Sequence, residues 1–324
     1  MYSAIETQAS RQSYIRWVIG GILFFGFLLF AFVFVYTGAY ELFTPTKEVA
    51  INKGIEDHPI EFEGLAIHYR TLCKKDQQPV IFIHGWGGPY ENRDQVTTAL
   101  HNQEFCVFTL EVPGLDRSTT PNEPWSNDQY VEYFKKVIAT LNIEKPIIIG
   151  QSFGGGVAAS YAKLYPDEIR YLVLVDANTT DKDFLYPKLI KLLGDTFSST
   201  LKSSLIPTSF KNLFIKNMLT VPDDALNASN HVERSVMGET FILTHTENQF
   251  EKLEHISTPT ILIWGESDRK VPVGKAKLMD EKLVNSTLVT LPGGHTVIYK
   301  DPEAVAKILK AEVEKLDVSS RSSN

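Results

Sequence analysis

Three residues of types that cooperate in covalent catalysis follow predicted strands in this chain. Ser152 lies in IIIGQSFGGG, where three β-branched residues precede a Gly-x-Ser-x-Gly turn and a small-residue helical run follows it. Asp268 comes after the apolar run TPTILIWG, and His295 comes after TLVTLPGG. A serine hydroxyl becomes a nucleophile when a histidine takes its proton and a carboxylate orients that histidine, which is the chemistry of acyl transfer. The chain order of these candidates is Ser, Asp, His.

The spacing around Ser152 has a steric reason. Gly150 and Gly154 stand two residues before and two residues after the serine. A serine raised on a tight strand-to-helix elbow has strained backbone angles, and the positions on either side of it must lack bulk. The elbow exposes the hydroxyl and directs the N-terminus of the following helix at the reacting centre.

A second glycine-containing loop lies in PVIFIHGWGG, where a predicted strand runs into a His-Gly-x-Gly-Gly sequence. In such a loop, backbone N–H groups point at an oxyanion, and we expect the N–H of Trp86 to act with that of Phe153. His84 and Gly85 are interpreted as supporting residues of this loop, with His84 bonding within the loop rather than acting as a base. Asp176, at the end of YLVLVDA, is the rival of Asp268 for the acid; otherwise it supports neighbouring loop N–H groups.

Apolar β-branched runs alternate with amphipathic segments along most of the chain. This alternation predicts an α/β fold with a parallel sheet that is buried on both faces. EFEGLAIHYRTL alternates as an edge strand or hairpin does. From about residue 180 to 250 the pattern changes to short helices punctuated by Pro187, Pro207 and Pro222, and the parallel pattern resumes at TPTILIWG.

These motifs resemble those of the α/β-hydrolase superfamily. The matching pieces are HGWGG (84–88), EVPGLDRS (111–118), GQSFG (150–154), GESDRKVP (265–272) and GGH (293–295). The resemblance implies Ser152 as nucleophile, His295 as general base and acid, and Asp268 as its partner. It also implies an α/β-hydrolase fold, with a mostly parallel sheet of about eight strands, helices on both faces and a helical cap or lid.

Two positions refine the resemblance. Serine rather than aspartate at the elbow argues against the dehalogenase and epoxide-hydrolase branches. Asp116 stands where the family pattern has a glycine, which affects the shape of the loop 111–118.

The predicted organisation is a tail and anchor over residues 1–45, a core over 46–178 and 252–317, a cap over 179–251 and a disordered tail over 318–324.

Residues 17–36, WVIGGILFFGFLLFAFVFVY, contain no charge. Twenty helical residues span about 30 Å, the thickness of the hydrocarbon core of a bilayer. We expect a single-pass N-terminal membrane anchor; the alternative is a cleaved signal peptide with Thr37-Gly38-Ala39 at the cleavage site. Arg11 and Arg16 precede the segment, which predicts an extracytoplasmic catalytic domain.

The bulk composition excludes several classes of function. The net charge of −7, without a run of Lys and Arg, gives no reason to expect a nucleic-acid partner. No Cys/His cluster has the spacing of a metal site and no Gly-rich loop suits a nucleotide, so neither metal nor cofactor is expected. Cys73 and Cys106 lie in apolar, strand-like surroundings and are interpreted as small core residues rather than a bridge.

The expected function is therefore that of a serine hydrolase acting on carboxylic esters, with monoacylglycerol or another lipid ester as the leading substrate class. The anchor and the apolar cap favour a lipid, and no obligate protein partner is evident. A proline-type aminopeptidase and a carbon–carbon bond hydrolase are alternatives on the same fold. A non-catalytic binding protein with this fold is the alternative of another class.

Overall fold

The computed structural model describes residues 49–86, 90–115, 117–178, 236, 240, 243–244 and 250–322. The predicted membrane segment 17–36, most of the predicted cap and Asp116 lie outside these ranges. Within them, no helix has both the length and the apolar character needed to cross a bilayer.

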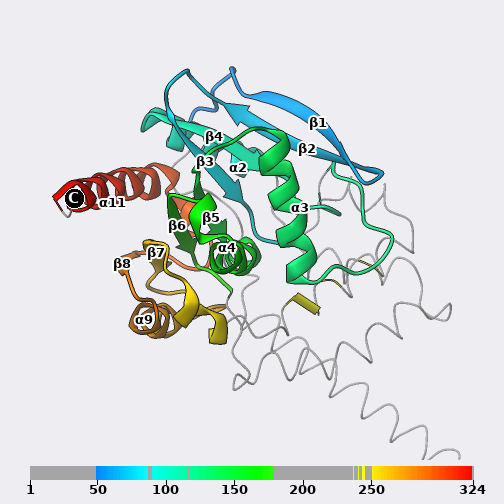
Figure 1. Ribbon diagram of the computed structural model, residues 1–324. Helices are drawn as coiled ribbons and strands as arrows, with labels where there is room; N and C mark the ends of the chain where they lie inside the picture. The colour runs from blue at the N-terminus through cyan, green and yellow to red at the C-terminus, as the bar shows by residue number, and fades with distance from the viewer. Residues whose placement is uncertain are drawn as a thin grey trace, which may run out of the picture. The chain divides into compact units, whose positions relative to one another are not determined.

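Across the described ranges, eight strands form one sheet in the order β1-β2-β4-β3-β5-β6-β7-β8 (Figure 1). They are β1 (Glu56–Phe62), β2 (Leu65–Leu72), β3 (Gln78–Ile83), β4 (Phe105–Leu110), β5 (Ile147–Gln151), β6 (Tyr171–Val175), β7 (Thr260–Gly265) and β8 (Ser286–Leu291). The β1–β2 and β2–β4 pairs are antiparallel, and every other neighbouring pair is parallel. The mostly parallel sheet and the N-terminal hairpin predicted from the sequence are confirmed.

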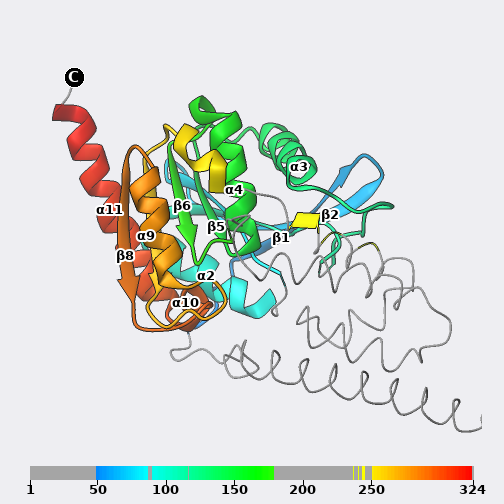
Figure 2. The ribbon, with the colours of Figure 1, turned by 90° about the horizontal axis from the view of Figure 1, so that it is seen from below.

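Helices cover both faces of the sheet. They are α2 (Tyr90–Asn102), α3 (Asn127–Thr140), α4 (Phe153–Leu164), α9 (Val273–Lys282), α10 (Val297–Lys300) and α11 (Pro302–Ser322), with 3-10 turns at Pro166–Glu168 and Phe250–His255. α3, α4 and α9 pack on one face, and α2, α10 and α11 pack on the other; Figures 1 and 2 show α11 across the sheet from α3 and α4.

The β-branched run of β5 explains why both faces are apolar. Successive side chains of a strand point to opposite faces. Ile148 therefore joins the cluster under α3 and α4, while Ile147 and Ile149 join the cluster under α2 and α11. All three are at most 1% exposed, so β5 is buried on both sides.

The strand order brings the carboxyl ends of distant segments together. β3 and β5 are direct neighbours, although β4 lies between them in the sequence. Ile83, the last residue of β3, pairs with Gly150 near the end of β5. The loop after β3 and the elbow after β5 therefore emerge side by side, at the edge where open α/β sheets place their sites.

The interpretation of the cysteines as separate core residues is wrong. Cys73 and Cys106 form a disulfide, with Cys73 exposed and Cys106 half-buried. Leu72, the last residue of β2, pairs with Val107 across the antiparallel β2–β4 ladder, so Cys73 just after β2 comes opposite Cys106 on β4. This register places the two sulfurs together, and a separation of 33 residues does not reveal it.

The predicted disordered tail from residue 318 is also incorrect through residue 322. α11 runs from Pro302 to Ser322. The Asp317 carboxylate accepts hydrogen bonds from Arg170 Nη2 at 2.8 Å and from the Tyr171 hydroxyl at 2.6 Å. Asp317 therefore ties α11 to Arg170 and Tyr171 at the residue before the predicted tail, and the helix continues from there.

Candidate active site

Ser152 occupies a sharp elbow between β5 and α4. Its backbone angles are φ 51° and ψ −116°, a region that costs a non-glycine residue about 1–3 kcal/mol. Its N–H donates to Val175 O at 3.0 Å, and its carbonyl accepts from Gly155 N at 2.9 Å and Asn178 N at 2.8 Å. These three bonds hold the strained conformation and fix the direction of the serine side chain.

Glycine is required on both sides of the elbow, as the sequence predicts. A Cβ atom at Gly150 would overlap the carbonyl oxygen of Gly154. A Cβ at Gly154 would overlap the carbonyl oxygen of Ile83, at the end of β3. Any larger residue at either position would push α4 or β3 away from the elbow.

The structure brings the three candidate catalytic side chains together. Ser152 Oγ lies 2.8 Å from His295 Nε2, and His295 Nδ1 lies 2.9 Å from Asp268 Oδ2. His295 comes from the loop between β8 and α10, and Asp268 comes from the loop after β7. Both residues are buried, with His295 6% and Asp268 5% exposed.

The remaining contacts of Asp268 fix the orientation of its carboxylate. Oδ1 accepts the backbone N–H groups of Lys270 at 2.8 Å and Val271 at 2.9 Å, and Oδ2 faces His295. A carboxylate only accepts hydrogen bonds, so His295 Nδ1 carries the proton in this pair. In the neutral imidazole, Nε2 then bears no hydrogen and can accept the Ser152 hydroxyl proton.

Asp176, the rival for the acid, has a different set of partners. It is fully buried, and its φ of 44° is unusual for a non-glycine residue. Oδ1 accepts the Gly265 N–H at 2.8 Å, and Oδ2 accepts the Val297 N–H at 3.2 Å. Asp176 therefore joins the end of β7 to the start of α10, which is the loop-supporting role considered for it from the sequence.

The two candidate oxyanion donors lie on neighbouring segments. Phe153 is the first residue of α4, where a backbone N–H has no acceptor within the helix. Trp86 follows Gly85 in the loop after β3, and its ring centroid lies 5.3 Å from that of Phe153. The contact between the rings places the two chain segments against each other beside Ser152.

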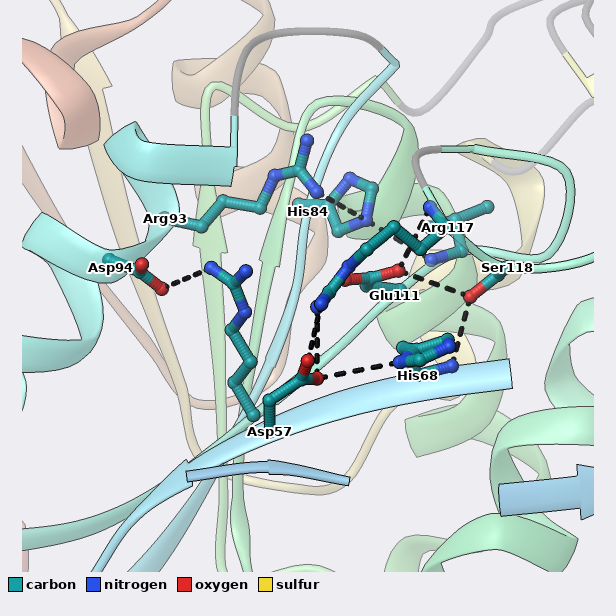
Figure 3. A network of polar contacts seen from close by, with 10 residues as sticks. Asp57, His68, His84, Arg93, Asp94, Glu111, Arg117 and Ser118 are labelled. Carbon is teal, nitrogen blue, oxygen red and sulfur yellow. Dashed lines mark hydrogen bonds and ion pairs between the residues drawn. The ribbon is translucent and has the colours of Figure 1, made fainter. Parts of the chain in front are cut away.

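His84 supports this loop through both ring nitrogens. Nδ1 lies 2.7 Å from Gly85 O, and Nε2 accepts the Val112 N–H at 3.1 Å. Because Nε2 is an acceptor, the ring is neutral with its proton on Nδ1. His84 is fully buried, and Arg93 Nη1 lies 3.5 Å from its Nε2 (Figure 3).

A charged network behind His84 was not predicted. Glu111, only 2% exposed, accepts hydrogen bonds from Arg117 Nη2 at 3.1 Å and from the Ser118 hydroxyl at 3.3 Å. Arg117 also forms an ion pair with Asp57 on β1, and Asp57 contacts His68 (Figure 3). The network fastens the ends of the 111–118 loop, from which Val112 contacts His84.

The network shifts the pKa of its exposed members. Burial raises the pKa of Asp57, but the hydrogen bonds and charges of Arg117 and His68 outweigh it, so this pKa lies below its usual range. Burial lowers the pKa of Arg117, but the hydrogen bonds and charges of Asp57 and Glu111 raise it by more than burial lowers it. The guanidinium therefore stays charged. The sequence contained one indication of this network, the charged residues of EVPGLDRS.

No group of three or more His, Cys, Asp or Glu side chains within the described ranges is arranged to hold a metal ion.

Comparison with known proteins identifies the family. The sequence model of the alpha/beta hydrolase fold family matches residues 78–302, which is more than half of the chain. The chain belongs to the α/β-hydrolase family. A 2-hydroxy-6-oxononadienedioate/2-hydroxy-6-oxononatrienedioate hydrolase of Paraburkholderia phymatum is 27% identical over 228 residues, covering 64% of this chain and 77% of the relative.

Solved structures share the fold at lower identity. A bacterial membrane phospholipase A superposes with a TM-score of 0.60 at 21% identity, covering 93% of this chain and 95% of that chain. A meta-cleavage product hydrolase superposes with a TM-score of 0.58 at 20% identity, covering 80% of this chain and 98% of that chain. At these identities, the likeness establishes the fold alone.

Proposed function

We propose that this α/β hydrolase is a serine hydrolase that cleaves carboxylic esters through an acyl-enzyme on Ser152. The observation that carries the proposal is the continuous hydrogen-bonded series from Ser152 Oγ through His295 to Asp268, set on a strained elbow at the carboxyl edge of the sheet. Strained backbone angles of this kind cluster at active sites.

The proposed reaction has two halves. His295 Nε2 takes the Ser152 proton while Oγ attacks the carbonyl carbon, and the N–H groups of Trp86 and Phe153 stabilise the oxyanion. His295 returns the proton to the departing alcohol as the carbon–oxygen bond breaks. Water then attacks the acyl-enzyme with His295 as base, releasing the acid and regenerating Ser152. Asp268 stabilises the imidazolium that forms in each half.

The proposed substrate class is an ester with an apolar acyl chain, such as a monoacylglycerol. The uncharged segment 17–36 supports this choice because it would hold the catalytic domain beside a membrane. Carbon–carbon bond hydrolysis is the second candidate, supported by the 2-hydroxy-6-oxononadienedioate hydrolase relative.

A substrate panel separates these candidates. Purified protein and its Ser152→Ala variant would be assayed with p-nitrophenyl esters, monoacylglycerols, prolyl amides and a 2-hydroxy-6-oxo-dienoate. The proposal expects kcat/KM to be highest for the medium- or long-chain esters and to vanish in the variant. Faster cleavage of the dienoate than of any ester would replace the proposal by its second candidate.

We also propose that residues 17–36 anchor the protein and that the catalytic domain lies outside the cytoplasm. Arg11 and Arg16 before the segment support this side. The Cys73–Cys106 disulfide supports it as well, because disulfides persist in oxidising compartments. Protease added to intact spheroplasts should digest the catalytic domain. Protection in intact spheroplasts, with digestion only after lysis, would reverse the assignment.

A further inference from the structure

We propose that Gln151 is a positioning residue that couples the oxyanion loop to the loop of the catalytic histidine. The inference rests on the proposed ester hydrolysis. Gln151 is the last residue of β5, directly before the nucleophile, and is 3% exposed. Its Oε1 accepts the Gly85 N–H at 3.1 Å, and its Nε2 donates to the His295 carbonyl oxygen at 3.2 Å.

The bond to Gly85 acts on the oxyanion donor. The carbonyl of Gly85 and the N–H of Trp86 belong to one planar trans peptide unit, so they point in opposite directions. His84 Nδ1 donates to that carbonyl at 2.7 Å, and Gln151 holds the N–H at the other end of Gly85. With both ends of Gly85 held, the direction of the Trp86 N–H is fixed before substrate arrives.

The bond to His295 acts on the general base. The His295 carbonyl is fixed by Gln151 Nε2, and its ring is fixed by Asp268 at Nδ1. Held at the main chain and at the ring, the imidazole keeps Nε2 within hydrogen-bond distance of Ser152. One amide side chain thus sets the separation between the oxyanion donor and the base on either side of the nucleophile.

A glutamine suits this position because its amide has an acceptor and a donor at one end of a chain of the required length. Leucine has a similar volume and neither group. Glutamate keeps an acceptor for Gly85, but its second oxygen faces the His295 carbonyl, which is also an acceptor. Gln151→Leu therefore removes both bonds, whereas Gln151→Glu removes only the bond to His295.

The test is steady-state kinetics of Gln151→Leu and Gln151→Glu on one p-nitrophenyl ester. The active sites of each preparation are counted by complete reaction with a fluorophosphonate, and kcat is expressed per active site. Ile149→Val, on the same strand but facing α2 and α11, is the matched control for a mild loss of core packing. A displacement of about 1 Å costs a catalytic group on the order of 10²-fold, so kcat per site should fall about 10- to 100-fold for Gln151→Leu.

Gln151→Glu should lose less activity than Gln151→Leu, KM should change little in either, and Ile149→Val should keep the kcat of the parent. An alkyl boronic acid, whose serine adduct places an oxygen at the oxyanion position, should lose affinity in proportion to kcat/KM. If Gln151→Leu has fewer titratable sites but the kcat of the parent per site, the residue is only structural and the inference is wrong.

An unchanged boronic acid affinity alongside a lower kcat would also overturn the coupling to the oxyanion loop. Should Gln151→Leu not fold, Gln151→Glu alone decides by the same criterion, per-site kcat. A parent protein that reacts with neither the fluorophosphonate nor any ester would instead refute the proposed function, so the two failures are distinguishable.

Discussion

Replacing Asp268 by asparagine changes one oxygen to an amide nitrogen and leaves the shape of the side chain almost unaltered. The structure determines which atom changes. Oδ1 accepts two backbone N–H groups, from Lys270 and Val271, so the amide oxygen must occupy that position. The NH₂ group then faces His295 Nδ1, which must become an acceptor. The imidazole proton moves to Nε2, where it blocks acceptance of the Ser152 proton.

The expected loss for this wrong tautomer is about 10³- to 10⁴-fold in kcat, with little change in stability. Asp176→Asn is the matched variant. Its two oxygens accept the N–H groups of Gly265 and Val297, so an amide leaves one buried N–H facing another donor. An unsatisfied buried donor costs about 1–3 kcal/mol of stability. We expect Asp176→Asn to unfold at lower urea concentration and to keep most of its kcat.

The assay is hydrolysis of one p-nitrophenyl ester by both variants, with urea unfolding followed by circular dichroism. We expect the two effects to separate, with activity lost in Asp268→Asn and stability lost in Asp176→Asn. If Asp176→Asn loses more kcat while both proteins are folded, the catalytic acid sits after β6, and the tautomer argument fails.

Three further predictions follow from particular contacts. Ser152→Ala should lower kcat about 10⁴- to 10⁶-fold with an unchanged circular dichroism spectrum, and substantial esterase activity in the folded variant would exclude Ser152 as nucleophile. Replacing Cys73 and Cys106 together by alanine should lower the free energy of unfolding by about 2–4 kcal/mol in urea without a reductant, because the bridge closes a long loop; equal stability of parent and variant would show that the thiols are unpaired. Because the pKa of Asp57 is lower in the folded state, its carboxylate stabilises the fold at pH values above the pKa that Asp57 has in the unfolded chain. This stabilisation is lost as the pH falls through the folded-state pKa of Asp57. Asp57→Asn should therefore be less stable than the parent at pH 7 and converge with it below about pH 4, whereas a constant difference would contradict the pairing with Arg117.

Local patterns were sufficient to predict the sheet and the elbow. The run Ile147–Ile149 and the flanking glycines carry their own physical reasons: β-branched side chains fill both faces of a parallel strand, and only glycine fits beside Ser152. Asp268 and His295 were predicted as candidates because each stands on a loop after a strand of the same parallel sheet. Parallel strands bring such loops to one edge.

The features that were missed depend on which segments meet in space. The disulfide requires the β2–β4 register, and the buried Glu111 requires Arg117 to fold back from the same loop. Gln151 stands at an unspecified position of the Gly-x-Ser-x-Gly pattern, and its two partners lie 66 and 144 residues away in the sequence. A single sequence gives residue types at these positions but not the contacts between loops.

The proposed mechanism passes through a covalent acyl intermediate on Ser152. Rapid acid quenching of the protein with excess p-nitrophenyl ester, followed by mass spectrometry of proteolytic peptides, tests it directly. We expect an acyl mass on Ser152 in the peptide that contains GQSFGG, formed before steady-state turnover and absent from Ser152→Ala. Ester turnover with no acylated peptide, or with the acyl group on another residue, would contradict it.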